Sequence, residues 1–251
     1  MIGAVPVLLA LAFLVTALLY ASVGFGGGST YAALLALSGL DYRLLPLIAL
    51  ACNIVVVAGS SIRFARAGLI PWRKALVLVA LGAPLSFLGG LTPIKEATFL
   101  TLLGASLVLT SLTMLIPVRE NSDSMPTRAA GWMGLAAAPL GYLAGLVGIG
   151  GGIFLAPLLH LTRWHEARGI AATASLFILV NSLFGLAGQL VKNGPGLFGP
   201  ALGAALPLLI AVVIGGQIGS LMAARLLPPK GIRWLTAALV LVVGVRLLAG
   251  V

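Results

Sequence analysis

The sequence predicts an all-α, polytopic membrane protein with two inverted-topology repeats, each a glycine-broken helical hairpin followed by three transmembrane helices. Three observations carry this prediction: the composition, ten apolar segments, and a glycine motif that occurs twice. Of the 251 residues, 61% are hydrophobic and 8% are charged, whereas soluble domains carry about 25% charged residues. We therefore expect a multi-pass protein of the cell (inner) membrane, with the lipid bilayer as its surroundings.

The ten segments are the candidate helices. Helix is the expected form because an isolated segment in lipid must satisfy its own backbone hydrogen bonds. About 20 apolar residues cross a bilayer. In order, the segments are 5–23, 28–39, 44–62, 75–91, 97–117, 130–147, 152–162, 169–190, 200–223 and 232–250. The polar stretch between the fifth and sixth segments divides the chain into a first repeat at 1–118, a cytoplasmic linker at 119–129 and a second repeat at 130–251.

The glycine motif indicates an internal duplication. Val23-Gly24-Phe25-Gly26-Gly27-Gly28 returns 124 residues later as Val147-Gly148-Ile149-Gly150-Gly151-Gly152. Nine of the fifteen positions from 23 to 37 match their counterparts. Chance matches of leucine and alanine are common in apolar sequence, but a glycine triplet in register followed by the same spacing is not.

Charge predicts the orientation of the helices. The net charge of +10 would suggest nucleic acid in a soluble protein, but the basic residues lie in short gaps between apolar runs, so no nucleic acid partner is expected. Lys and Arg concentrate in short cytoplasmic loops. If the gap holding Arg63, Arg66, Arg73 and Lys74 is cytoplasmic, alternation places 11 basic residues inside and 4 outside. In this arrangement the two hairpins open to opposite sides, and the repeats are inverted.

The second and seventh segments are too short to cross a bilayer. At about 1.5 Å per residue they span roughly 17 to 18 Å, so each is expected to begin inside the membrane. Glycines before each segment permit the positive φ of a tight turn. Such backbone is tolerated at depth only within protein or beside water. Two helix N-termini with free N–H groups would form a midplane site for a small anion. The alternative is that these glycines only let helices pack closely.

These motifs resemble the sulfite exporter TauE/SafE family, which is grouped with toluenesulfonate-uptake permeases. The resemblance covers nearly the whole chain and includes both glycine motifs, 154–159 (FLAPLL) and 215–220 (GGQIGS). It implies a prokaryotic membrane protein that moves sulfite, sulfonates, sulfoacetate or related organic anions. The first repeat has Gly89-Gly90 where the second has Gly216, Gln217 and Gly219, so the two halves are not expected to contribute equal polar groups.

The candidate substrate-binding residues are the glycines and the uncharged polar residues of the segments. A lone serine or threonine more often bonds to its own helix, whereas Asn53 and Asn181 are costlier to leave unpaired. The predicted set is Gly24, Gly26, Gly27, Gly28, Ser29, Thr30, Asn53, Gly148, Gly150, Gly151, Gly152, Thr173, Ser175, Asn181 and Gln217. Ser60, Ser61, Ser182 and Gln189 are further polar residues of the segments.

Several chemistries have no support in the sequence. All five acidic residues fall in gaps or at segment ends, so no midplane carboxylate for proton transfer is expected. No catalytic triad, zinc-ligand spacing or nucleotide motif occurs, and Cys52 is the single cysteine. The sequence therefore predicts a transporter without cofactor or metal, working by alternating access, rather than an enzyme, and the family resemblance implies export. An anion channel with the same site and a membrane chaperone or assembly protein remain the alternatives, and the oligomeric state is left open.

Overall fold

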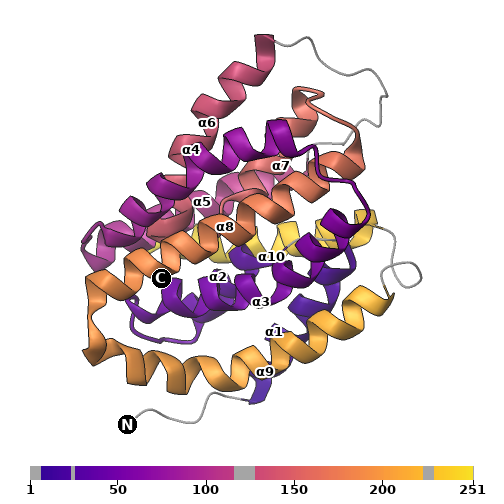
Figure 1. Ribbon diagram of the computed structural model, residues 1–251. Helices are drawn as coiled ribbons and strands as arrows, with labels where there is room; N and C mark the ends of the chain where they lie inside the picture. The colour runs from indigo at the N-terminus through magenta and orange to yellow at the C-terminus, as the bar shows by residue number, and fades with distance from the viewer. Residues whose placement is uncertain (1–6, 24–25, 116–127, 223–228, 251) are drawn as a thin grey trace.

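The computed structural model describes residues 7–23, 26–115, 128–222 and 229–250, which form ten α-helices and one short 3₁₀ helix without a strand (Figure 1). The helices are α1 Val7–Val23, α2 Gly28–Leu37, α3 Leu44–Arg66, α4 Trp72–Leu91, α5 Glu96–Leu115, α6 Arg128–Val147, α7 Gly152–Leu161, α8 Ala167–Asn193, α9 Phe198–Met222 and α10 Pro229–Ala249, with η1 at Pro195–Leu197. The all-helical prediction and the order of the ten segments are confirmed.

The boundaries differ from prediction at a few ends. α4 begins at Trp72, three residues before the expected start, because Pro71 precedes it as N-cap and its carbonyl accepts the first bonds, from Lys74 and Ala75. Residues 119–127 of the predicted linker lie outside the described part of the chain. The last two linker residues, Arg128 and Ala129, already belong to α6.

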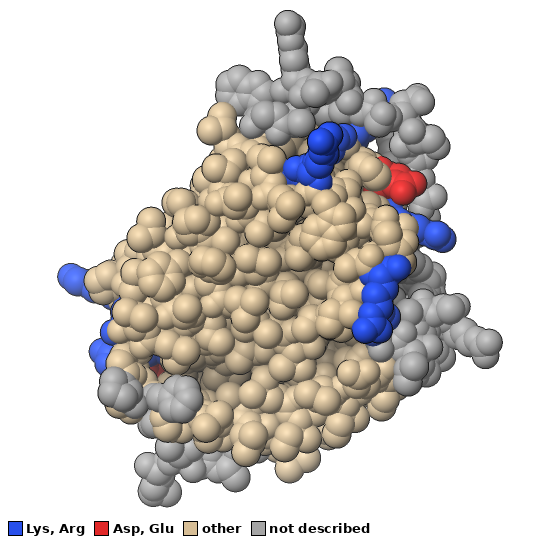
Figure 2. Space-filling model, viewed as in Figure 1, with Lys and Arg blue, Asp and Glu red and all other residues tan. Residues whose placement is uncertain are grey.

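The surface and the helix lengths are those of a multi-pass membrane protein. Among the described residues, five helical stretches are long and apolar enough to cross a membrane: Leu44–Arg66, Trp72–Leu91, Glu96–Met114, Ala167–Asn193 and Ala201–Gly219. In the view of Figure 2, Lys and Arg side chains lie toward the two ends of the bundle, and a wide surface without charged residues separates them. An apolar surface on this scale marks contact with lipid or with another protein, and the long apolar helices indicate lipid.

Helices of one half pack mainly against helices of the other. α4 packs on α6 and α8, and in a corresponding way α9 packs on α1 and α3. α3 also pairs with α8, and α5 with α10. The two sequence halves therefore interlock, and neither half forms a separate packed body.

Small residues allow the closest of these crossings. A Cβ built on Gly145 of α6 would overlap the carbonyl of Ser86 in α4, and one on Gly219 of α9 would overlap the carbonyl of Leu18 in α1. Without a Cβ the two backbones approach to van der Waals contact, which is how small residues stabilise helix pairs in lipid.

Corresponding helices of the two halves run in opposite directions where they meet. Ser61, near the end of α3, lies 3.1 Å from Ser175, near the start of α8, through their hydroxyl oxygens. The side chain of Leu50, in the first half of α3, packs beside Gly185, late in α8. In the other pair, Ser111 of α5 donates to the carbonyl of Ala237 in α10 at 2.9 Å, while Gly104 lies against Leu248.

Candidate functional site

Two interrupted helices carry the candidate site. α2 and α7 each have ten residues, which is about 15 Å of helix. Each begins after a glycine in the left-handed region, Gly27 with φ 75° and Gly151 with φ 74°. Residues with a Cβ rarely adopt this conformation. The helices consequently begin at these glycines, where α2 and α7 turn back from α1 and α6.

The two breaks meet in the buried centre of the protein. Asn53 of α3 donates a hydrogen bond from Nδ2 to the carbonyl oxygen of Ile149 in the second break, at 3.3 Å. Gly28 of the first break lies so close that a Cβ there would overlap both the Ile149 carbonyl and the Asn53 side chain. Asn53 and both glycine runs, 26–28 and 148–152, are buried. The expected convergence of the breaks is thus present in the geometry.

α8 supplies the other side of this contact. A Cβ built on Gly26 would lie 3.2 Å from Cγ2 of Ile178. A Cβ built on Gly150 would lie 3.0 Å from the same atom and 3.1 Å from Oγ of Ser182. We call this cluster the turn junction. Its members are Gly26, Gly28, Asn53, Ile149, Gly150, Ile178 and Ser182.

The remaining glycines of the predicted set face other neighbours. Gly27 faces Thr16, Tyr20 and Tyr31, and Gly148 packs on Pro46. Gly151 lies against Ala144 and Phe177, and Gly152 against the side chain of Ile178 and the carbonyl of Ala174. Gly24 lies outside the described residues. Of the seven predicted glycines that the structure describes, therefore, Gly26, Gly28 and Gly150 border Asn53.

Most of the predicted hydroxyl residues bond within the protein. Thr173 donates to the carbonyl of Gly169 in its own helix at 2.8 Å, and Ser175 bridges to Ser61. The hydroxyl of Thr30 lies 3.0 Å from that of Tyr20. Ser29, in the first turn of α2, is buried with an oxygen that has no hydrogen-bond partner.

The two amides predicted beside Asn53 lie apart from the turn junction. Asn181 donates to the carbonyl of Phe177 in its own helix at 2.8 Å, and its Oδ1 faces Gly82 of α4. Gln217 is exposed on α9. The buried glutamine is Gln189, whose Nε2 donates to the carbonyls of Gly145 and Leu146 at the end of α6.

Three members of the turn junction, Ile149, Ile178 and Ser182, were not in the predicted set. Ser182 was noted as a polar residue of its segment, and Ile178 was not singled out because an apolar residue in an apolar helix carries no signal. Their spacing of four residues places them on one face of α8. Knowing which face meets the breaks requires the packing of α8 itself.

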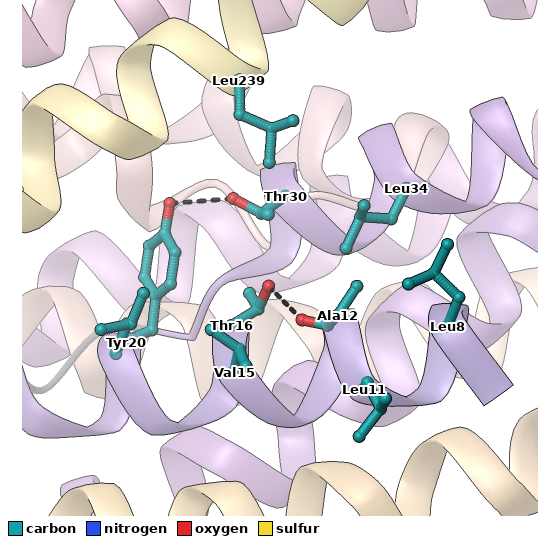
Figure 3. A pocket seen from close by; sticks show the side chains of 10 residues that line it. Leu8, Leu11, Ala12, Val15, Thr16, Tyr20, Thr30, Leu34 and Leu239 are labelled. Carbon is teal, nitrogen blue, oxygen red and sulfur yellow. Dashed lines mark hydrogen bonds between the residues drawn. The ribbon is translucent and has the colours of Figure 1, made fainter.

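A separate cavity of about 360 Å³ lies between α1, α2 and α10. Figure 3 shows its lining, which is mostly leucine, valine and alanine side chains with Thr16, Tyr20 and Thr30. The Thr16 hydroxyl donates to the carbonyl of Ala12, and Tyr20 pairs with Thr30. An anion would find few polar partners here, so this cavity suits apolar chains rather than the predicted cargo.

The electrostatics of the turn junction come from backbone dipoles, since none of its members is charged. The described acidic residues, Asp41, Glu96 and Glu166, are exposed outside the helix interiors. The first N–H groups of a helix lack intrahelical partners and carry about half a positive charge. α2 and α7 both begin beside the junction, so the N-terminal ends of both helix dipoles contribute positive potential there without a formal cation.

Multiple apolar spans with two broken helices meeting at the centre define a multi-pass membrane protein of the transporter class. Residues 8–247 match the family described as Sulfite exporter TauE/SafE, so the chain belongs to that family. The family indicates a membrane transporter rather than an enzyme.

This chain aligns with two curated relatives over almost the whole length of both sequences. One, named "Probable membrane transporter protein", is from Sinorhizobium fredii and is 36% identical over 96% of this chain and 97% of the relative. Another with the same description, from Methanocaldococcus jannaschii, is 24% identical over 97% of this chain and 95% of the relative. No solved structure matches the chain.

Proposed function

We propose that this protein is a secondary transporter of small anions such as sulfite, sulfonates or sulfoacetate, working by alternating access around the turn junction. The observation that carries the proposal is the meeting of Gly28 with Ile149 beside Asn53. Two helix N-termini at one buried point attract an anion without a lysine or arginine that would hold it tightly. Family membership supports sulfur oxyanions and favours export.

We further propose that the two repeats have inverted topology in the membrane. The antiparallel run of α3 against α8 and of α5 against α10 supports this arrangement. The corresponding packing of α4 on α6 and of α9 on α1 supports it as well. A two-fold axis in the membrane plane would place one break on each side of the site. The site could then be exposed to either face of the membrane in turn.

The experiment is counterflow in proteoliposomes with Gly28→Ala. The added methyl group would push the turns apart, because it falls on the Ile149 carbonyl and Asn53. Overpacking typically costs about 1–3 kcal/mol, so we expect exchange to fall by about fivefold or more. The matched control is Gly203→Ala in α9, where no atom lies within 4 Å of the new Cβ.

Normal exchange by Gly28→Ala would remove the turn junction from the transport path. Equal folded yield of the two variants, judged by size-exclusion chromatography, separates loss of transport from loss of the protein. Trans-stimulation by unlabelled anion is expected of a carrier. Its absence, together with rapid anion flux, would favour the channel alternative.

A further inference from the structure

The amide of Asn53 is held in one orientation at the turn junction. Its Nδ2 donates to the Ile149 carbonyl, so the amide nitrogen faces the second break. Its Oδ1 lies 2.8 Å from a Cβ built on Gly26 of the first break, whereas a Cβ built on Gly28 would overlap both Nδ2 and Oδ1. This oxygen is fully buried and has no hydrogen-bond partner. An amide oxygen can only accept, so it requires a donor.

Two hydroxyl groups without partners accompany it. Ser29 follows Gly28 in the first turn of α2, and Ser182 lies beside Gly150. Both side chains are buried. In α8, by contrast, Thr173 bonds to its own helix backbone and Ser175 to Ser61. A buried polar group without a partner costs about 1–3 kcal/mol, so the unpartnered oxygens of Asn53 and Ser182 within the turn junction indicate a bound group.

The three oxygens differ in what they can bind. The serine hydroxyls and the first N–H groups of α2 and α7 can donate to the oxygens of an anion. Asn53 Oδ1 would repel those same oxygens, because both carry partial or full negative charge. A ligand satisfies the whole set only if it combines an anionic group with a donor of its own.

We infer that the cargo is an oxyanion that also carries a hydrogen-bond donor, a hydroxyl or an acid hydrogen, which pairs with Asn53 Oδ1. This inference rests on the proposed function and narrows its substrate class. Hydroxylated sulfonates and hydrogen sulfite fit the description, whereas alkyl sulfonates and the sulfite dianion do not. Sites that hydrogen-bond a substrate hydroxyl discriminate strongly against analogues without it, because a buried acceptor is then left unpaired.

The first test uses two anions of nearly equal size, isethionate, which carries a hydroxyl, and ethanesulfonate, which does not. Each competes for counterflow in proteoliposomes made with the wild type, Asn53→Leu or Asn181→Leu. In the wild type we expect isethionate to compete about tenfold better or more. The ratio should fall to about one in Asn53→Leu. It should stay at the wild-type value in Asn181→Leu, the matched buried asparagine whose unpartnered Oδ1 faces Gly82 of α4 instead of the turn junction.

The second test uses one anion in two protonation states and so removes any effect of size. At constant total sulfite, efflux from vesicles should follow the fraction present as hydrogen sulfite and fall as the pH rises. Efflux that follows the dianion, equal competition by both sulfonates, or an unchanged ratio in Asn53→Leu would overturn the inference. Discrimination that appears only with sodium would also overturn it, because a cation would then be the partner of Oδ1. Failure of every anion, with or without a donor, would instead contradict the proposed function.

Discussion

Gln189 shows at the residue scale how a buried amide can serve structure alone. Its Nε2 donates to the carbonyls of Gly145 and Leu146, which belong to the last turn of α6, where no intrahelical partner is available. The side chain therefore satisfies the helix end that leads into the second glycine break. Asn53 performs a comparable task for Ile149, but its second polar atom is left for another group.

Gln189→Ala is expected to destabilise the protein without changing substrate affinity. Two buried carbonyls would lose their donor and a space would open, at a cost of about 1–3 kcal/mol. A lower midpoint of thermal unfolding in detergent, with an unchanged half-saturating anion concentration in counterflow, is the expected result. A change in affinity at unaltered stability would place Gln189 on the transport path.

The residue scale also decides which glycine variants are informative. A leucine at Gly27 or Gly151 would be strained whatever space it finds, because both have positive φ. Loss of transport there would reflect backbone strain as much as a blocked site. Gly28 has no positive φ, so an alanine there reports on the space between the breaks.

At the scale of elements, the α3–α8 pair holds the turn junction in place. Asn53 of α3 and Ile178 and Ser182 of α8 together contact the two breaks. The pair is joined at one end by the hydroxyls of Ser61 and Ser175. Movement of one helix along the other would therefore reshape the site directly.

Ser61→Cys with Ser175→Cys should form a disulfide in a Cys52→Ala background. The two hydroxyl oxygens are 3.1 Å apart, so the sulfur atoms can approach to bonding distance with little backbone change. Gel mobility after copper-phenanthroline oxidation measures the product. Ser60→Cys with Ser175→Cys is the matched control, because one residue turns the side chain by about 100° around α3. Equal cross-linking of both pairs, or of neither, would contradict this register.

At the scale of the whole molecule, the two sequence halves interlock. The motion of alternating access is therefore not expected to be a movement of one sequence half against the other. Simple rocking of one sequence half against the other would break the α4–α6 and α1–α9 contacts, which are among the closest in the protein. The packing instead groups α4 with α6 and α8, and α9 with α1 and α3. Relative movement of these mixed groups would open the turn junction and preserve the tight glycine crossings.

Orientation in the membrane can be measured with single cysteines in a Cys52→Ala background. Cysteines replacing Arg43 or Lys95 should react with an impermeant maleimide added outside intact cells, whereas cysteines replacing Arg66 or Arg163 should react only after permeabilisation. The expectation follows from the excess of basic residues on the predicted cytoplasmic side and from the opposed directions of α3 and α8. Labelling of Arg43→Cys and Arg163→Cys from the same side would contradict inverted repeats.

The outline of the fold was predictable from the sequence because lipid imposes simple rules. Apolar runs of sufficient length must be helices there, and a glycine motif repeated 124 residues apart marks the two breaks directly. Both signals are local, so neither needs knowledge of which helices touch. The same locality explains why Asn53 could be selected as a costly buried amide.

Tertiary packing alone decided which polar residues gather at the breaks. Asn53 and Asn181 are both buried asparagines in corresponding helices, yet one joins the two turns and the other bonds to its own backbone. Ile178 and Ser182 entered the junction, and Gln217 came to lie on the outer surface. In lipid, an apolar composition says that a helix is buried in the bilayer but not which face meets protein. That choice depends on where small residues let neighbouring backbones come close.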